Sequence, residues 1–225
     1  MRIFLDTADV PTIVKHYSTG LIDGVTTNPT LIMKSHRKPD DVYQELKNIG
    51  LKDISMEVVG HSAAEMVTEG LRLVDLFGEC ATIKVPCTRD GLQACKELWK
   101  KGVRVNVTLI FNSAQAVLAA KAGAAYVSPF VGRLVDNSIH GLECVRYISE
   151  IYQKQWIKTE VLAASIRDVF SVTEAFYHGA QVVTMPPSVF EKMYDHVLTD
   201  KGVEMFASDW ANVLAETTGL PSNTK

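Results

Sequence analysis

The sequence has no apolar run that approaches the length of a membrane span and no excess of basic charge. Its 23 lysines and arginines are outnumbered by 26 aspartates and glutamates, which gives a net charge of −3. A chain of this charge lacks the positive field that attracts nucleic acid or an anionic membrane surface. We therefore expect small-molecule partners, with no nucleic acid and no membrane among them.

The sequence also lacks a secretory signal and any spacing typical of a metal or redox site. Its first six residues enter a strand-like run without a signal-peptide apolar region. The four cysteines form no CxxC pair, and the six histidines form no HExxH motif and no paired Cys/His spacing. These absences predict a cytoplasmic protein with reduced cysteines, no metal and no cofactor.

What the sequence does have is a regular series of glycines. Each ends a helix-like segment, and a strand-like run follows within a few residues. The run after Gly20, at Leu21 and Ile22, would be the second strand of the chain. With further strands at residues 3–5 and 161–164, eight strands alternate with eight helices. Strict alternation predicts a parallel α/β sheet, and eight such units predict a (β/α)8 TIM barrel, with a doubly wound sheet as the alternative. The glycines are Gly20, Gly50, Gly78, Gly102, Gly123 and Gly179.

A C-terminal segment remains that this barrel does not need. Residues 199–215 carry an apolar stripe at helical spacing, made of Val203, Phe206, Trp210, Val213 and Leu214. We expect residues 1–198 to form the catalytic barrel domain and residues 199–225 an extra C-terminal amphipathic helix and tail. The stripe fits either its own barrel or a neighbouring subunit, and the sequence does not choose between them.

One lysine stands inside an apolar run, Ala81–Pro86, that is typical of a buried strand. A buried ammonium is costly unless it is paired or neutral. Apolar surroundings lower the pKa of a lysine, and its free amine can then attack a carbonyl to form a Schiff base. The alternative is an edge-strand lysine whose amine reaches solvent, and this run alone does not separate the two.

Strand alternation favours a buried, reactive lysine over an edge-strand lysine. Successive residues of a barrel strand face opposite sides, so if Ile83 and Val85 face the helices then Lys84 faces the interior. The same rule puts further chemistry-bearing residues at or just beyond the C-terminal ends of seven strands, where barrel active sites lie. They are Asp6, Asn28, Glu57, Lys84, Thr108, Arg133 and Ser165. This convergence favours catalysis over scattered surface residues.

Five motifs in this order, LDTAD, GVTTNPTL, ATIKVP, NVTLIF and YVSPFVGR, make the chain resemble the transaldolase family. The resemblance runs roughly from residue 3 to residue 210 and is greatest to the small subfamily that also contains fructose-6-phosphate aldolase. It implies a pentose phosphate pathway enzyme that moves a dihydroxyacetone unit between sugar phosphates. Sedoheptulose 7-phosphate or fructose 6-phosphate would be the donor, and glyceraldehyde 3-phosphate or erythrose 4-phosphate the acceptor. It also implies a homo-oligomer, a pentamer or a decamer.

The resemblance assigns a role to each candidate residue. Lys84 would form the Schiff base, Asp6 would be the acid/base, and Glu57 with Thr108 would position a catalytic water. The protein-bound imine polarises the substrate carbonyl, so this chemistry requires no metal. The substrate-binding positions are Asn28, Thr26, Asn106, Ser128, Phe130, Arg133, Ser165 and Arg167, the last three of which would bind the phosphate.

Two alternatives remain open at this stage. Within the family, aldolases that release free dihydroxyacetone typically carry glutamine at the position of Glu57 and tyrosine at that of Phe130, so this chain has the transferase pattern. From another class, the chain would be an inactive sugar-phosphate-binding barrel. The presence of both Lys84 and Asp6 argues against that reading.

Overall fold

The computed structural model describes residues 1–218 and contains a closed barrel of eight parallel strands. The strands follow one another around the barrel in sequence order, and β1 pairs with both β2 and β8. They are β1 (Arg2–Asp6), β2 (Gly24–Thr26), β3 (Ile54–Glu57), β4 (Ala81–Pro86), β5 (Val105–Ile110), β6 (Tyr126–Pro129), β7 (Glu160–Ala163) and β8 (Val182–Met185). The predicted (β/α)8 barrel is confirmed, and the doubly wound sheet is wrong.

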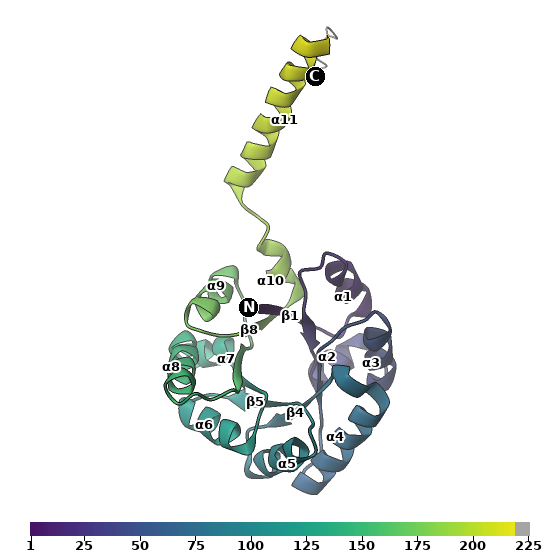
Figure 1. The fold of residues 1–225 in the computed structure, drawn as a ribbon, viewed down its shortest axis with the longest axis vertical. Coiled ribbons are helices and arrows are strands. Elements are labelled where there is room, and N and C mark those ends of the chain that lie inside the picture. Colours follow the sequence, from purple (N-terminus) through teal and green to yellow (C-terminus); the bar gives the residue numbers. More distant parts are fainter. Residues whose placement is uncertain (219–225) are drawn as a thin grey trace. The chain divides into compact units, whose positions relative to one another are not determined.

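Helices surround the strands and bury their outward-facing side chains (Figure 1). Ile83 and Val85 of β4, for example, are fully buried against this layer together with Leu98. The helices are α1 (Val10–Tyr17), α2 (Pro29–Ser35), α3 (Pro39–Asn48), α4 (Ala63–Phe77), the 3-10 turn η1 (Gly78–Cys80), α5 (Arg89–Lys100), α6 (Ser113–Ala122), α7 (Val131–Asp136), α8 (Gly141–Lys154), α9 (Val169–Tyr177) and α10 (Pro187–Lys192).

The glycine series behaves as the sequence predicts. All six glycines have a positive φ, between 68° and 95°, a region that side chains with a Cβ rarely adopt. At Gly123, a Cβ would also lie 2.5 Å from the ring of Trp99. The glycines therefore reverse the chain where a helical segment ends and lead it toward the next strand.

The second strand begins later than predicted, at Gly24 instead of Leu21. Residues 21–23 form the loop before it, in which the Asp23 carboxylate accepts a hydrogen bond from the backbone N–H of Ile3 at 2.8 Å. The pairing of β2 with β1 starts where Gly24 lies opposite Phe4. A Cβ at this glycine would lie 2.7 Å from the Phe4 ring and from the Asp53 carbonyl oxygen, so the first residue of β2 has room for glycine alone.

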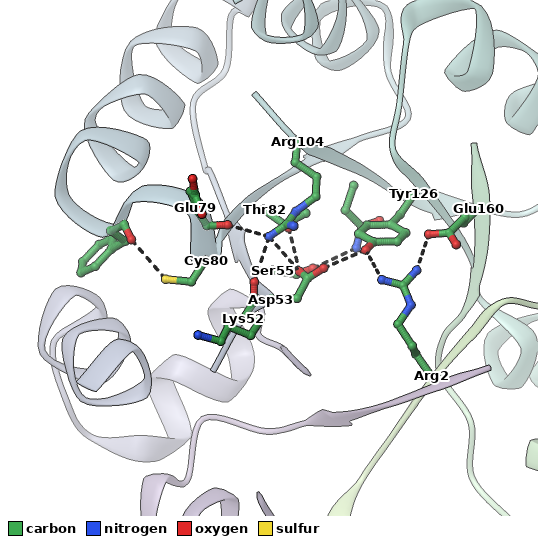
Figure 2. Close-up of polar contacts among 12 residues, drawn as sticks. Arg2, Lys52, Asp53, Ser55, Glu79, Cys80, Thr82, Arg104, Tyr126 and Glu160 are labelled. Atoms are coloured by element: carbon green, nitrogen blue, oxygen red, sulfur yellow. Dashed lines mark hydrogen bonds and ion pairs between the residues drawn. The ribbon is translucent and has the colours of Figure 1, made fainter. Parts of the chain in front are cut away.

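A polar network occupies the barrel interior at the N-terminal ends of the strands (Figure 2). Its centre is Asp53, which is 4% exposed and accepts hydrogen bonds of 2.7 Å from both Tyr126 and Thr82. Arg104 donates to Thr82 at 2.6 Å, and Arg2 donates to the Tyr126 hydroxyl at 2.7 Å. Burial and the neighbouring carboxylate raise the pKa of Tyr126 to about 12, so its hydroxyl stays protonated and donates.

Residues from Glu191 onward form a second compact unit, which contains α11 (Val197–Thr218). The predicted C-terminal helix is therefore present, and its residues Val203, Phe206 and Trp210 are each more than 60% exposed. The predicted domain boundary at residue 198 stays a prediction, and residues 219–225 of the predicted tail lie outside the described residues. Over residues 1–218, no helix combines the length and apolar character that crossing a membrane requires.

We expect Asp53→Ala to lower the free energy of unfolding by about 3–5 kcal/mol, because it leaves the buried hydroxyls of Tyr126 and Thr82 without their acceptor and removes the carboxylate 3.7 Å from the Arg104 guanidinium. The matched control is Asp40→Ala, which removes a carboxylate that also pairs with an arginine, Arg72, but is about half exposed. That variant should lose less than about 1 kcal/mol. Urea unfolding measures both, and equal losses would contradict the structural importance of the Asp53 network.

Candidate active site

A cavity of about 110 Å³, lined mostly by polar side chains, opens at the C-terminal ends of the strands. The structure brings nine of the twelve predicted site residues into its wall: Asp6, Thr26, Asn28, Lys84, Asn106, Ser128, Phe130, Arg133 and Ser165. Leu162, Ala164 and Thr184 complete the lining. Glu57, Thr108 and Arg167 do not line this cavity.

Lys84 points into the barrel from β4 and is 5% exposed. Its ammonium lies 2.8 Å from a carboxylate oxygen of Glu57 and donates to the backbone carbonyl of Thr27 at 3.0 Å. The register of β3 and β4 creates the ion pair, because Glu57 lies directly opposite Lys84. The buried charge is therefore paired, as its burial requires, and the lysine does not reach solvent as an edge-strand lysine would.

Asp6 ends β1 in the same cavity. Thr26 donates a hydrogen bond of 2.8 Å to one of its carboxylate oxygens. Burial raises the pKa of the Asp6 carboxyl above its usual value, and this effect outweighs the opposing effects of the Thr26 hydrogen bond and the Lys84 charge. A carboxyl with a raised pKa exchanges protons closer to neutral pH, which suits a general acid/base.

Glu57 and Thr108 lie on β3 and β5, the strands on either side of β4, and line no part of the cavity that contains Lys84. Glu57 contributes instead to a second cavity, lined by residues of α2, α3 and α4. Thr108, on β5, is 1% exposed, and its hydroxyl has no hydrogen-bond partner among the described residues. A buried hydroxyl in this state is unusual and is a place where a bound water is expected.

Asn106 is held in one orientation by two serines. Its side-chain oxygen accepts from Ser128 at 2.7 Å, and its side-chain nitrogen donates to Ser55 at 3.2 Å. Asn106 also lies opposite Lys84 in the register of β4 and β5. Ser55, labelled in Figure 2, follows the same strand alternation as Lys84, because its neighbours Ile54 and Met56 pack in the layer between barrel and helices.

Helix α7, which follows β6, and the loop after β7 supply the cationic side of the site. The guanidinium of Arg133 lies 5.0 Å from the ring centroid of Phe130, and Ser165 adopts a positive φ of 58°. Arg167 is about half exposed and forms a two-pronged ion pair with Asp136, with one contact at 2.5 Å. In this structure, then, Arg133 and Ser165 face the cavity while Arg167 faces a carboxylate beside it.

Thr184 is a cavity residue that sequence reasoning missed. It is on β8, where its neighbours Val183 and Met185 pack in the layer between barrel and helices. Strand alternation alone would have placed Thr184 inside the barrel. None of the motifs that carry the resemblance contains this threonine, so only strand alternation points to it.

Fold and site together define a class, a (β/α)8 barrel in which a buried lysine, paired with Glu57, shares a cavity with Asp6 at the C-terminal ends of the strands. Sequence comparisons agree with that class. A sequence model described as "Transaldolase/Fructose-6-phosphate aldolase" matches residues 3–217. The chain therefore belongs to the transaldolase/fructose-6-phosphate aldolase family.

Three curated relatives, each named "Probable transaldolase", match almost the whole chain. The relative from Paracoccus denitrificans is 50% identical over 211 residues, which cover 94% of this chain and 97% of the relative. That from Nitrosopumilus maritimus is 48% identical over 217 residues, 96% and 97% of the two chains. That from Caulobacter vibrioides is 49% identical over 212 residues, 94% and 97% of the two chains.

We expect Asp6→Asn to stabilise the protein at pH 7. The native pKa of Asp6 lies above its unfolded value of about 3.9, so the native state binds the proton more tightly and stability falls as pH rises through this window. Asparagine avoids this loss and keeps an acceptor for Thr26. The gain should be largest at pH 7 and should shrink toward pH 4, where both states of the parent protein bind the proton.

Thermal unfolding at several pH values measures this effect, with Asp136→Asn as the control. The Arg167 guanidinium lowers the pKa of the Asp136 carboxyl, so that substitution should lower the melting temperature at pH 7 or leave it unchanged. A melting temperature of Asp6→Asn below that of the parent protein at pH 7 would contradict the prediction.

Proposed function

We propose that the protein is a transaldolase that acts through a Schiff base on Lys84. It takes a dihydroxyacetone unit from sedoheptulose 7-phosphate or fructose 6-phosphate and passes it to glyceraldehyde 3-phosphate or erythrose 4-phosphate. A place in the pentose phosphate pathway and in the cytoplasm is part of the same proposal. The observation that carries it is the buried Lys84 amine, 2.8 Å from Glu57 and in one cavity with Asp6.

Schiff-base formation begins when Lys84 loses a proton, and Glu57 is the acceptor at hydrogen-bond distance. The neutral amine then adds to the ketone carbon of the substrate, and the carbinol oxygen leaves as water. Glu57 and Thr108 position that water in the proposal. The buried Thr108 hydroxyl, which has no partner among the described residues, supports this role.

Cleavage follows from the electron demand of the imine. Asp6 takes the proton of the hydroxyl next to the bond that breaks, the bond electrons move into the imine, and an aldose phosphate leaves. A dihydroxyacetone unit stays on Lys84 as an enamine, with its hydroxyls held by Asn28, Asn106 and Ser128. An incoming aldose phosphate reverses these steps and carries the unit away.

The phosphate fits the cationic side of the cavity. Arg133 and Ser165 line it, and a guanidinium matches the geometry of a phosphate dianion. Arg167 joins them by exchanging its contact with Asp136 for the phosphate. That pair is about half exposed, so it is weak enough to be exchanged.

Transfer is favoured over release of free dihydroxyacetone because the enamine must survive until an acceptor arrives. Phe130 presents an apolar ring to the cavity, packed edge-on against Phe111 at 5.9 Å between ring centroids. It offers no hydroxyl that would protonate the enamine. Release of dihydroxyacetone by a fructose-6-phosphate aldolase is the second candidate, since the family description names both activities.

Borohydride reduction in the presence of fructose 6-phosphate tests the nucleophile. Peptide mass spectrometry should find a three-carbon adduct on Lys84, and none in Lys84→Met. The control variant, Lys100→Met, changes an exposed lysine and should form the adduct at the parental level. An adduct on another lysine would refute the assignment, and binding of ketose phosphate without any adduct would favour an inactive binding barrel. Assays with and without erythrose 4-phosphate separate the two activities, because only an aldolase releases dihydroxyacetone at full rate without it.

We also propose that the protein is a homo-oligomer, a pentamer or decamer, in which α11 contacts a neighbouring subunit. The exposed apolar residues of α11 and the match of the family model through residue 217 support this. Truncation after Leu198 should reduce the number of subunits per particle, as measured by analytical ultracentrifugation, and so should Trp210→Ser. The matched control is Trp156→Ser, since Trp156 is 91% exposed on the barrel unit. An unchanged number of subunits in the truncated protein would contradict the role of α11.

A further inference from the structure

Three polar side chains from neighbouring strands form a hydrogen-bonded chain that ends on Asp6. Thr26 on β2 donates to the Asp6 carboxylate at 2.8 Å, and its hydroxyl oxygen lies 2.7 Å from that of Thr184 on β8. Both threonines are 2% exposed. The chain therefore connects the predicted acid/base to a cavity residue that no motif contains.

The direction of the protons in this chain is determined by chemistry. A carboxylate only accepts, so Thr26 uses its single hydroxyl proton on Asp6. The hydrogen bond between the two threonines then has Thr184 as its donor. Thr184 thereby holds the Thr26 hydroxyl oxygen from the opposite side and keeps its proton directed at the carboxylate.

The barrel register explains why these residues meet. β1 lies between β2 and β8, with Asp6 opposite Thr26 and Phe4 opposite Thr184. Phe4 is fully buried and lies on the same face of β1 as Asp6. The two threonines thus approach each other across the inward face of β1, which fixes their separation through three paired strands.

We infer that Thr184 is a positioning residue for the acid/base Asp6 and acts on it through Thr26. This inference rests on the function proposed above for Asp6. Thr184 makes no bond to the substrate in this account. It keeps the Asp6 carboxylate and its hydrogen-bond donor in one arrangement while the proton is transferred.

Charged groups around Asp6 set the background for this effect. Lys84 on β4 lowers the pKa of Asp6, Glu57 on β3 raises it, and Arg133 lines the same cavity. The Thr26 hydrogen bond also lowers that pKa. A change confined to Thr184 keeps all three charges and disturbs only the hydrogen bond. It should therefore raise the pKa of Asp6.

The test compares Thr184→Val, which has the same shape without the hydroxyl, with Thr184→Ser, which keeps the donor. We expect Thr184→Val to lower kcat for transfer about ten-fold with little change in KM, as loss of one ordered hydrogen bond predicts. The acidic limb of its pH profile should move to higher pH by about half a unit to one unit. Thr184→Ser should recover kcat to within about two-fold of the parent protein.

Thr82→Val is the matched control. Thr82 is likewise a buried threonine, and it donates to a buried aspartate, Asp53, at the other end of the barrel. It should lower stability without moving the acidic limb. An unmoved limb in Thr184→Val, or equal kcat losses in the valine and serine variants, would overturn the inference.

Two measurements separate this inference from the proposed function. Titration of the Asp6 carboxyl by NMR in protein labelled with carbon-13 aspartate should show the upward shift in Thr184→Val without any turnover. Borohydride trapping on Lys84 should persist in that variant. Trapping with an unshifted Asp6 titration overturns the inference alone, whereas no trapping in the parent protein overturns the proposed function and the role of Asp6 with it.

Discussion

The ion pair between Lys84 and Glu57 is the interaction on which the site depends, and closure of the barrel makes it possible. A closed sheet leaves no edge from which a lysine could reach solvent, so an inward lysine must find a partner inside. The β3–β4 register supplies one by placing Glu57 directly opposite. A slip of one residue in β4 would turn Lys84 toward the helices and Ile83 into the cavity. The apolar packing of Ile83 and Val85 therefore fixes the register that the proposed chemistry needs.

The same pair leaves Asp6 without a cation of its own. One ammonium at the site faces two carboxylates, and Glu57 is the one in direct contact. Asp6 instead receives the hydroxyl of Thr26, and its pKa stays raised because burial is the largest effect on it. An unpaired, buried carboxyl lowers stability at neutral pH while making proton transfer easier, which is the trade-off expected where a site is selected for activity.

The sequence predicts those features that depend on local rules. Glycine predicts the helix ends because only it adopts a positive φ freely, and alternation predicts which way Lys84 and Ser55 point. Features that depend on contacts between distant residues are missed. The need for glycine at the start of β2 depends on the Phe4 ring across the ladder, and the hydrogen bond of Thr184 on a threonine 158 positions earlier. The pairing of Arg167 with Asp136 is likewise a contact between a loop and the end of α7 that no spacing rule describes.

The two ends of the barrel use buried polar groups in opposite ways. At the N-terminal end, both oxygens of Asp53 accept hydrogen bonds from residues of other strands, and the donors are themselves held by arginines. At the C-terminal end, the Thr108 hydroxyl has no partner within residues 1–218, and Ser165 holds a strained positive φ at the cavity wall. A network that satisfies itself has no bonding capacity left for a ligand, whereas the groups at the other end do. Because the strands are shared, the closed network at one end holds the register that keeps Lys84, Glu57 and Asp6 in place at the other.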